Sequence, residues 1–107
     1  MDFYIKDTLW RLQFVRPSSE RLKNSQGLYT LGVTDNNIKT VFIADNLTQE
    51  KEELVICHEL THCICFEYDI YLPIDLEEWL CNFVAEHGKE IIYLLDDLLS
   101  VIMVNVA

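Results

Sequence analysis

The sequence predicts an α+β fold, in which strands come first along the chain and helices follow. In the N-terminal part, apolar and polar residues alternate as they do in half-buried strands, and a turn signal rich in Asn and Asp separates two such runs. The rest of the chain has longer apolar runs, two of which follow acidic first turns. Helices that follow strands usually cover one face of an antiparallel sheet. We therefore expect a small antiparallel three-stranded sheet packed on a long helix and one or two further C-terminal helices.

The first expected strand spans residues 9–16, where Trp10, Leu12 and Phe14 alternate with other residues. A period of two places these three side chains on one face of a strand. A Pro-Ser-Ser sequence then ends the strand, and residues 19–25 are expected to form a short helix.

The other two expected strands form a hairpin of residues 28–34 and 38–44. Both runs are rich in residues that favour strands, and Asp35-Asn36-Asn37 joins them. Asn and Asp tolerate the positive φ angles of tight turns better than most residues. The spacing therefore predicts two antiparallel neighbours in the sheet.

The first long helix is expected over residues 49–66. Thr48 suits its N-cap, the first turn is polar and acidic, and an apolar run follows. A second helix is expected over residues 76–86 with Asp75 as its cap, and residues 91–103 are again apolar and helical in character. A glycine between these two segments either ends the second helix or is tolerated inside it.

Composition restricts the classes of function. The chain has 107 residues, of which 50% are hydrophobic, and a formal net charge of −10. One domain over residues 1–107 is expected at this length. A strongly acidic protein is unsuited to the phosphate backbone of nucleic acids, and the apolar runs are shorter than the roughly 20 residues of a membrane-spanning helix. We expect neither nucleic acid nor membrane as a partner.

The four cysteines are expected to be free thiols. The N-terminal residues are partly acidic and lack the apolar segment of a secretory signal, which predicts a cytoplasmic protein. Thiols stay reduced in that compartment, although a structural Cys/His zinc site is an alternative use of these side chains. The residues leave the oligomeric state open. The cysteines are Cys57, Cys63, Cys65 and Cys81.

The motif that carries chemistry is His58-Glu59-Leu60-Thr61-His62, inside the first long helix. Two histidines four residues apart are rotated by about 40° and separated by one turn, so both imidazoles can reach one metal ion. Glu59 lies about 100° round the helix, where its carboxylate could take a proton from a water on that metal. The flanking residues are apolar, so these polar groups need partners, which a divalent metal supplies together. Hydrogen-bonded core or surface histidines are the alternative interpretation.

A catalytic zinc needs a third protein ligand and an open position. Glu77 and Glu78 are two candidates, but an acidic first helical turn also explains both of them. Cys65 shares the face of the histidines but lies a further turn along, where a packed core thiol is expected. The residues alone leave several candidates open, namely Glu77, Glu78, Cys65, Cys81 and His87.

The segment Glu78-Trp79-Leu80-Cys81-Asn82-Phe83-Val84-Ala85 resembles a motif of the ImmA/IrrE family of small gluzincin metallopeptidases. In that family a Glu is followed by two residues, a small residue, Asn, one residue, an apolar residue and Ala. Cys81 stands at the small position, and Thr61 stands where the family usually has Gly or a similar small residue. The resemblance covers roughly residues 28–86.

The resemblance implies a role for each of five residues in a minimal zincin-like domain. His58, His62 and Glu78 would hold Zn²⁺, and Glu59 would be the general base. Asn82, one turn beyond the ligand glutamate, would orient a zinc-bound histidine through its distal ring nitrogen.

The implied function is a zinc-dependent metallopeptidase that hydrolyses peptide bonds with a Glu-activated zinc-bound water. The domain would be of the minimal kind that bacterial and phage genomes encode, and its substrate would be a protein or peptide, such as a repressor or regulator. The strand at residues 41–44 would be the edge strand that pairs with the substrate, and Tyr68, Tyr71 or Tyr93 could face the oxyanion. The alternative is a zinc-stabilised, non-catalytic protein-interaction module, because the apolar segment 91–106 is more than a small domain easily buries.

Overall fold

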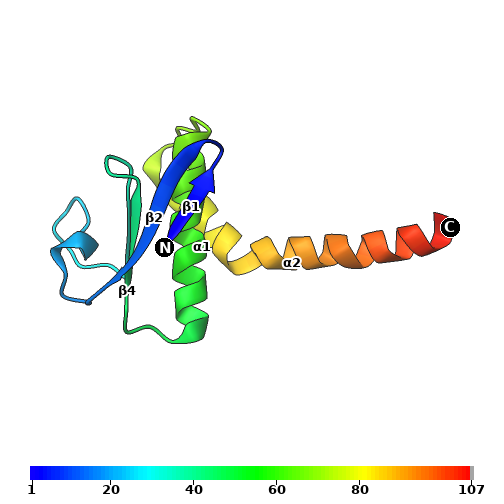
Figure 1. The fold of residues 1–107 in the computed structure, drawn as a ribbon, viewed down its shortest axis with the longest axis horizontal. Coiled ribbons are helices and arrows are strands. Elements are labelled where there is room, and N and C mark those ends of the chain that lie inside the picture. The colour runs from blue at the N-terminus through cyan, green and yellow to red at the C-terminus, as the bar shows by residue number, and fades with distance from the viewer. Residues whose placement is uncertain (107) are drawn as a thin grey trace.

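The computed structural model describes residues 1–106 and has the expected α+β class (Figure 1). The strands form one sheet with the order β1-β2-β4-β3, and the helices follow the strands along the chain. The elements are β1 (Asp2–Ile5), β2 (Thr8–Val15), the short 3₁₀ helix η1 (Glu20–Leu22), β3 (Gly32–Asp35), β4 (Thr40–Ala44), α1 (Gln49–Glu67) and α2 (Ile74–Val106).

The prediction of a three-stranded antiparallel sheet is wrong in two respects. A fourth strand, β1, pairs antiparallel with β2, and β2 itself runs parallel to β4. β1 has four residues of which Ile5 alone is buried, so its alternation is too short to stand out in the sequence. Lys6, in the turn to β2, has a positive φ of 53°. This conformation is uncommon for lysine, and the neighbouring residues in the sequence do not indicate it.

The parallel pairing follows from the position of the hairpin. β3 and β4 are antiparallel neighbours as predicted, with Gly32 opposite Ile43. Residues 16–31 lead the chain to the far edge of the sheet, so the hairpin returns β4 to the centre, beside β2. β3 begins at Gly32 rather than at residue 28, and the positive φ of the turn falls on Lys39, not on the expected Asn residues.

β4 is the centre of the core because both of its faces are buried. Val41 and Ile43 lie with Trp10 in the cluster covered by α1. The alternate residues of β4 face the other way and pack on Leu22 of η1. The helix expected over residues 19–25 is only the three-residue η1, and its Leu22 covers the second face of the sheet.

The helices begin close to the predicted positions. The Thr48 hydroxyl accepts a hydrogen bond from the backbone N–H of Lys51 at 3.2 Å, which confirms it as the N-cap of α1. α2 begins at Ile74, so Asp75 lies inside its first turn instead of capping it. Gly88 lies within α2, and the two C-terminal segments predicted separately are one continuous helix.

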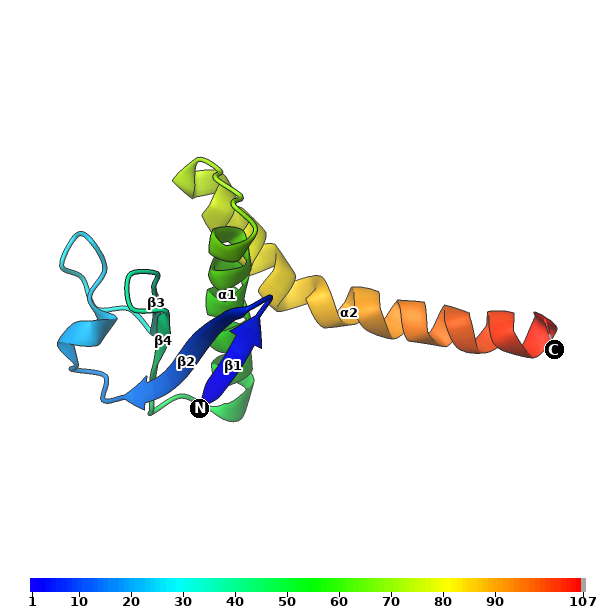
Figure 2. The same ribbon diagram turned by 45° about the horizontal axis from the view of Figure 1, so that its top comes forward.

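The C-terminal part of α2 extends away from the rest of the molecule (Figures 1 and 2). The first turns of α2 pack on α1, whereas residues 89–104, here called the arm, are all exposed. The molecule accordingly measures 56 × 32 × 28 Å along its principal axes. Within residues 1–106, neither helix combines the length and the apolar character needed to cross a membrane.

Glu67, the last residue of α1, joins the helix to the sheet. Its Oε1 accepts hydrogen bonds from Trp10 Nε1 at 2.9 Å and Lys39 Nζ at 3.0 Å, and its Oε2 accepts one from Thr8 Oγ1 at 2.9 Å. The hydrogen bonds from Lys39 and Thr8 hold the pKa of Glu67 below its ordinary value. One carboxylate thus links two strand ends of the sheet to the end of α1.

Glu67→Gln is expected to lower Tm at neutral pH, because an amide accepts more weakly from Lys39 and loses the charge. A carboxyl with a lowered pKa stabilises the fold above its unfolded pKa, near 4.5, and this stabilisation is lost as the pH falls through the folded pKa. The Tm difference between wild type and variant should therefore be largest near neutrality and shrink below about pH 4.5. Calorimetry across this range measures it, and a difference independent of pH would contradict a role for the charge.

Candidate metal centre

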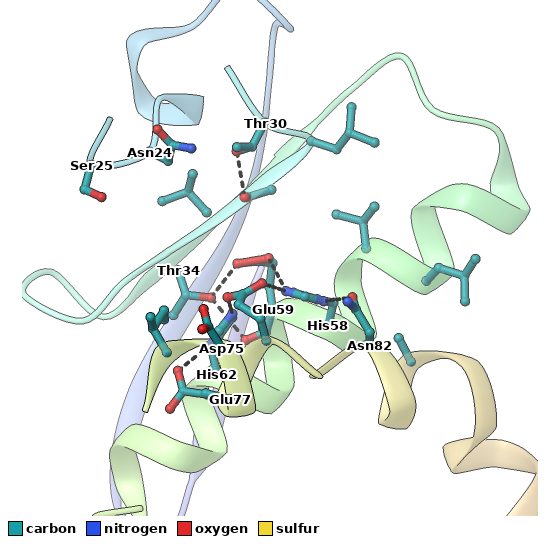
Figure 3. A pocket seen from close by; sticks show the side chains of 18 of the residues that line it. Asn24, Ser25, Thr30, Thr34, His58, Glu59, His62, Asp75, Glu77 and Asn82 are labelled. Atoms are coloured by element: carbon teal, nitrogen blue, oxygen red, sulfur yellow. Dashed lines mark hydrogen bonds and ion pairs between the residues drawn. The ribbon is translucent and has the colours of Figure 1, made fainter. Parts of the chain in front are cut away.

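α1 presents two imidazoles to the same cleft. His58 and His62 lie one turn apart, with ring centroids 5.0 Å from each other. They line a cleft of about 790 Å³ between β3, α1 and the first turns of α2 (Figure 3). The spacing of the motif therefore brings the two rings together as the sequence indicates.

Glu78 brings a carboxylate from α2 to both rings. Its Oε2 lies 3.2 Å from Nε2 of His58, and its Oε1 lies 2.9 Å from Nε2 of His62. The side chain is half exposed, so the carboxylate borders the cleft. The two Nε2 atoms and this carboxylate form a compact group of three donors from two helices.

The other nitrogen of each ring is also held from α2. Nδ1 of His58 lies 2.9 Å from Oδ1 of Asn82, the contact expected for that residue, and Nδ1 of His62 lies 2.8 Å from Oε2 of Glu77. Each Nδ1–H can donate to its oxygen, which leaves the Nε2 lone pair directed at the Glu78 carboxylate. The role of Glu77 was missed from the sequence, where it appeared only as a rival ligand, because helical spacing does not tell which of two adjacent carboxylates meets which ring.

Glu59 is buried beside this group. Its Oε2 lies 3.9 Å from Nε2 of His58, and its Oε1 accepts a hydrogen bond from Thr34 Oγ1 at 3.0 Å. Burial raises the pKa of Glu59, while the neighbouring His62 and His58 and the Thr34 hydroxyl oppose that rise. A carboxylate held in this way next to two imidazoles is suited to accept a proton. Thr34 lies on β3, far from the motif in sequence, and nothing in its local pattern indicated this contact.

β3 approaches α1 closely at the level of Glu59. A Cβ atom at Gly32 would lie 2.8 Å from Cγ1 of Val55, 3.0 Å from Cγ of Glu59 and 3.3 Å from Cδ1 of Ile43. Distances this short leave no space for a side chain. Gly32 therefore permits the approach that brings Thr34, two residues further on, to the general-base candidate.

Cys81 is a competing donor. Donor atoms of His58, His62 and Cys81 lie within 4.8 Å of one another. Cys81 is fully buried, and burial raises the pKa of its thiol to about 12, so the sulfur is protonated at neutral pH without a metal. The separations of Glu78 from the two rings are shorter, and its carboxylate is accessible from the cleft. We therefore regard Glu78 as the better placed third donor.

The remaining candidates from the sequence lie elsewhere. Cys65 is buried, and His87 is exposed with its Nδ1 3.0 Å from a carboxylate oxygen of Glu90. All four cysteines are free thiols. Within the described residues, the lining of the cleft does not include the tyrosines proposed to face an oxyanion. These tyrosines, Tyr68, Tyr71 and Tyr93, are exposed.

The expectation that residues 41–44 form the edge strand is wrong. This segment is β4, which lies between β2 and β3. Along the described part of the chain, the sheet edge beside the cleft is β3, and residues 30–34 line the cleft. The hairpin places the later strand inside the sheet and the earlier one at its edge.

The donor set fits a zinc ion. Zinc binds imidazole nitrogen and carboxylate oxygen at about 2.0–2.2 Å, so ligand atoms around one ion lie roughly 3–3.5 Å apart. The two Nε2–carboxylate separations, 3.2 and 2.9 Å, are close to this spacing. Metal-binding histidines usually donate their other N–H to an oxygen, as both rings can here. Two imidazoles and one carboxylate would leave the fourth tetrahedral position open.

Two histidines and a glutamate on one helix, faced by a carboxylate from the next, resemble the arrangement of the HExxH class of metallopeptidases. Residues 17–94 match the family model of the M78 peptidases, described as the IrrE N-terminal-like domain. The chain belongs to this family. A search of curated proteins gives no match.

Gly32→Ala is expected to lower the free energy of unfolding by about 1–3 kcal/mol, because the added methyl group overlaps Val55 and Glu59. Gly88→Ala is the matched control: its Cβ would lie 3.4 Å from Val84 Cγ1, an ordinary contact, and alanine favours a helix interior by up to about 1 kcal/mol. Urea denaturation of both variants measures the two effects. Equal stability of Gly32→Ala and wild type would show that β3 and α1 are not in close contact.

Proposed function

We propose that this protein is a zinc-dependent metallopeptidase that hydrolyses peptide bonds. The observation that carries the proposal is the convergence of His58 Nε2, His62 Nε2 and the Glu78 carboxylate beside the buried carboxylate of Glu59. Zinc bound by these three side chains would polarise a peptide carbonyl and lower the pKa of the attacking water.

The residues around the proposed zinc position have different roles in the reaction. Glu59 accepts the proton of the attacking water and passes it to the leaving amine. Thr34 fixes the Glu59 carboxylate by its hydrogen bond, so that one oxygen remains directed towards the rings. Asn82 and Glu77 hold the rings by their Nδ1 atoms and keep both Nε2 atoms available.

We propose that the substrate is an extended segment of a protein, bound along β3. This strand is the sheet edge beside the cleft, and an extended peptide can add to such an edge by main-chain hydrogen bonds. Asn24 and Ser25 line the end of the cleft opposite the two imidazole rings (Figure 3). The cleft therefore has room for several substrate residues on one side of the peptide bond that is cleaved. A cytoplasmic repressor or regulator is the class of substrate that we propose.

Glu59→Gln is expected to keep its zinc and to lose about 10²- to 10⁴-fold in kcat, the usual contribution of a general base. Glutamine has nearly the same shape and still accepts from Thr34, but it cannot take a proton. Cleavage of a mixed peptide library, followed by mass spectrometry, gives the rate, and Glu90→Gln on the arm is the control. Undiminished cleavage by Glu59→Gln would remove the assigned role.

Metal content distinguishes the two possible donor sets. Wild type should hold about one zinc per chain, His58→Ala and Glu78→Ala should bind it more than about tenfold more weakly, and Cys81→Ser should bind it as wild type does. Inductively coupled plasma mass spectrometry after dialysis against a zinc buffer measures this. The opposite result, with zinc retained by Glu78→Ala and lost from Cys81→Ser, would assign the third ligand to sulfur.

The second candidate function is a zinc-stabilised, non-catalytic interaction module. The exposed arm favours it, since its apolar side chains have no cover within the described residues of the chain. The two functions predict different results for the wild-type protein. A zinc-loaded wild type that cleaves no peptide in the library, alongside unchanged metal binding by Glu59→Gln, would favour the module.

A further inference from the structure

The arm, residues 89–104, has a large apolar face with nothing packed on it. Its apolar side chains are between 43% and 76% exposed, more than a soluble monomer usually leaves in one patch. Six of these apolar residues recur at intervals of three or four, namely Ile91, Leu94, Leu95, Leu98, Leu99 and Ile102.

These six side chains share one side of the helix. At 100° per residue they fall within an arc of about 140°, and the neighbouring Ile92, Val101 and Met103 widen the arc to about 200°. The remaining side carries Asp96, Asp97 and the other polar residues of the arm, together with the apolar Tyr93 and Val104. A continuous apolar face of this kind is typical of a helix that packs on a neighbour, and it differs from single leucines scattered over a surface.

The same side of α2 is already used in the body of the protein. Cys81 is fully buried where α2 packs on α1, and it points in about the direction of Leu95 and Leu99 by the same helical geometry. An ion pair between Lys89 and Glu53 marks the end of this contact. Beyond it α2 leaves α1 at an angle (Figure 2), and its apolar side chains there are exposed.

A helix of this length is not stable alone in water. Isolated helices of about 12–15 residues are marginal even with the best composition, and most helical stability in proteins comes from packing of the apolar face. The described part of the chain provides no packing for the arm, so its cover lies outside these residues.

We propose that the arm packs on the arms of other copies of this chain and forms a helical bundle. Each exposed apolar side chain offers roughly 100 Å², so one face offers on the order of 900 Å², about what each partner contributes to a stable interface. A second arm supplies an equally apolar and equally long face. An arc of about 200° exceeds the roughly 100° that one helical neighbour covers, so each arm has room for two neighbours.

Charge favours other copies over a membrane surface. Helices that lie on membranes carry Lys and Arg on their polar side, which anionic lipids attract. The polar side of the arm carries Glu90, Asp96 and Asp97 against one Lys89, and the whole chain has a net charge of −10. In a bundle these carboxylates lie on the outside in water, where they are well solvated.

The test is the mass of the 107-residue protein at micromolar concentration, measured by light scattering after gel filtration. The chain mass is 12.6 kDa, and we expect an assembly of at least two chains, with three or four favoured by the width of the arc. Leu98→Asp should raise the dissociation constant of the assembly by at least about a hundredfold, because it buries an unpaired carboxylate. Ser100→Asp adds the same charge on the opposite side of the helix and should leave the assembly intact.

Two further measurements keep the result interpretable. Leu98 is 61% exposed and lies outside the packed body, so Leu98→Asp should keep the near-ultraviolet circular dichroism of the body, which contains the buried Trp10, and this excludes misfolding of the body as the cause of any change. Flotation with neutral phosphatidylcholine vesicles tests a lipid partner. A wild type that is monomeric at micromolar concentration would overturn the proposal, whether it floats with the vesicles, which would assign the arm to a lipid surface, or remains free.

Discussion

The arrangement of this protein depends on one constraint: five ionisable side chains lie close together between α1 and α2, and each needs a polar partner. α1 alone cannot supply these partners, because its histidines and Glu59 project from an otherwise packed surface. Their partners come from elements other than α1. Thr34 comes from β3, and three further partners come from α2, namely Glu77, Glu78 and Asn82. The site therefore exists only when the hairpin and both helices are assembled, and the fold is as much a consequence of these contacts as their cause.

The close approach of β3 to α1 is the structural condition for the contact between Thr34 and Glu59. A strand normally keeps enough distance from a covering helix for side chains on both. Gly32 removes one of those side chains, and the hydroxyl of Thr34 then reaches Glu59 at hydrogen-bonding distance. At the other end of α1, Glu67 holds the helix to the opposite part of the sheet, so that the helix is fixed at both ends of its buried face.

The sequence predicted best those features that are encoded in one continuous stretch of residues. An N-cap, an acidic first turn and an apolar run located α1, and alternation located most of β2. The spacing of the two histidines, together with the family resemblance that selected Glu78 and Asn82, placed four side chains that the structure brings together. The errors concern relations between distant segments. Which strand lies at the sheet edge depends on the path of residues 16–31, where no periodic pattern exists, and the partnership of Glu77 with a ring depends on the angle between two helices.

α2 passes without a break from the site to the arm, and this gives the two regions a thermodynamic connection. Glu77, Glu78 and Asn82 lie on the same continuous helix as Leu98. Whatever binds the arm and favours one tilt of the helix must change the affinity of the rings for a metal by a factor that depends on that tilt. Linkage makes the effect reciprocal, so that metal occupancy would alter the affinity of the arm for its partner by the same factor.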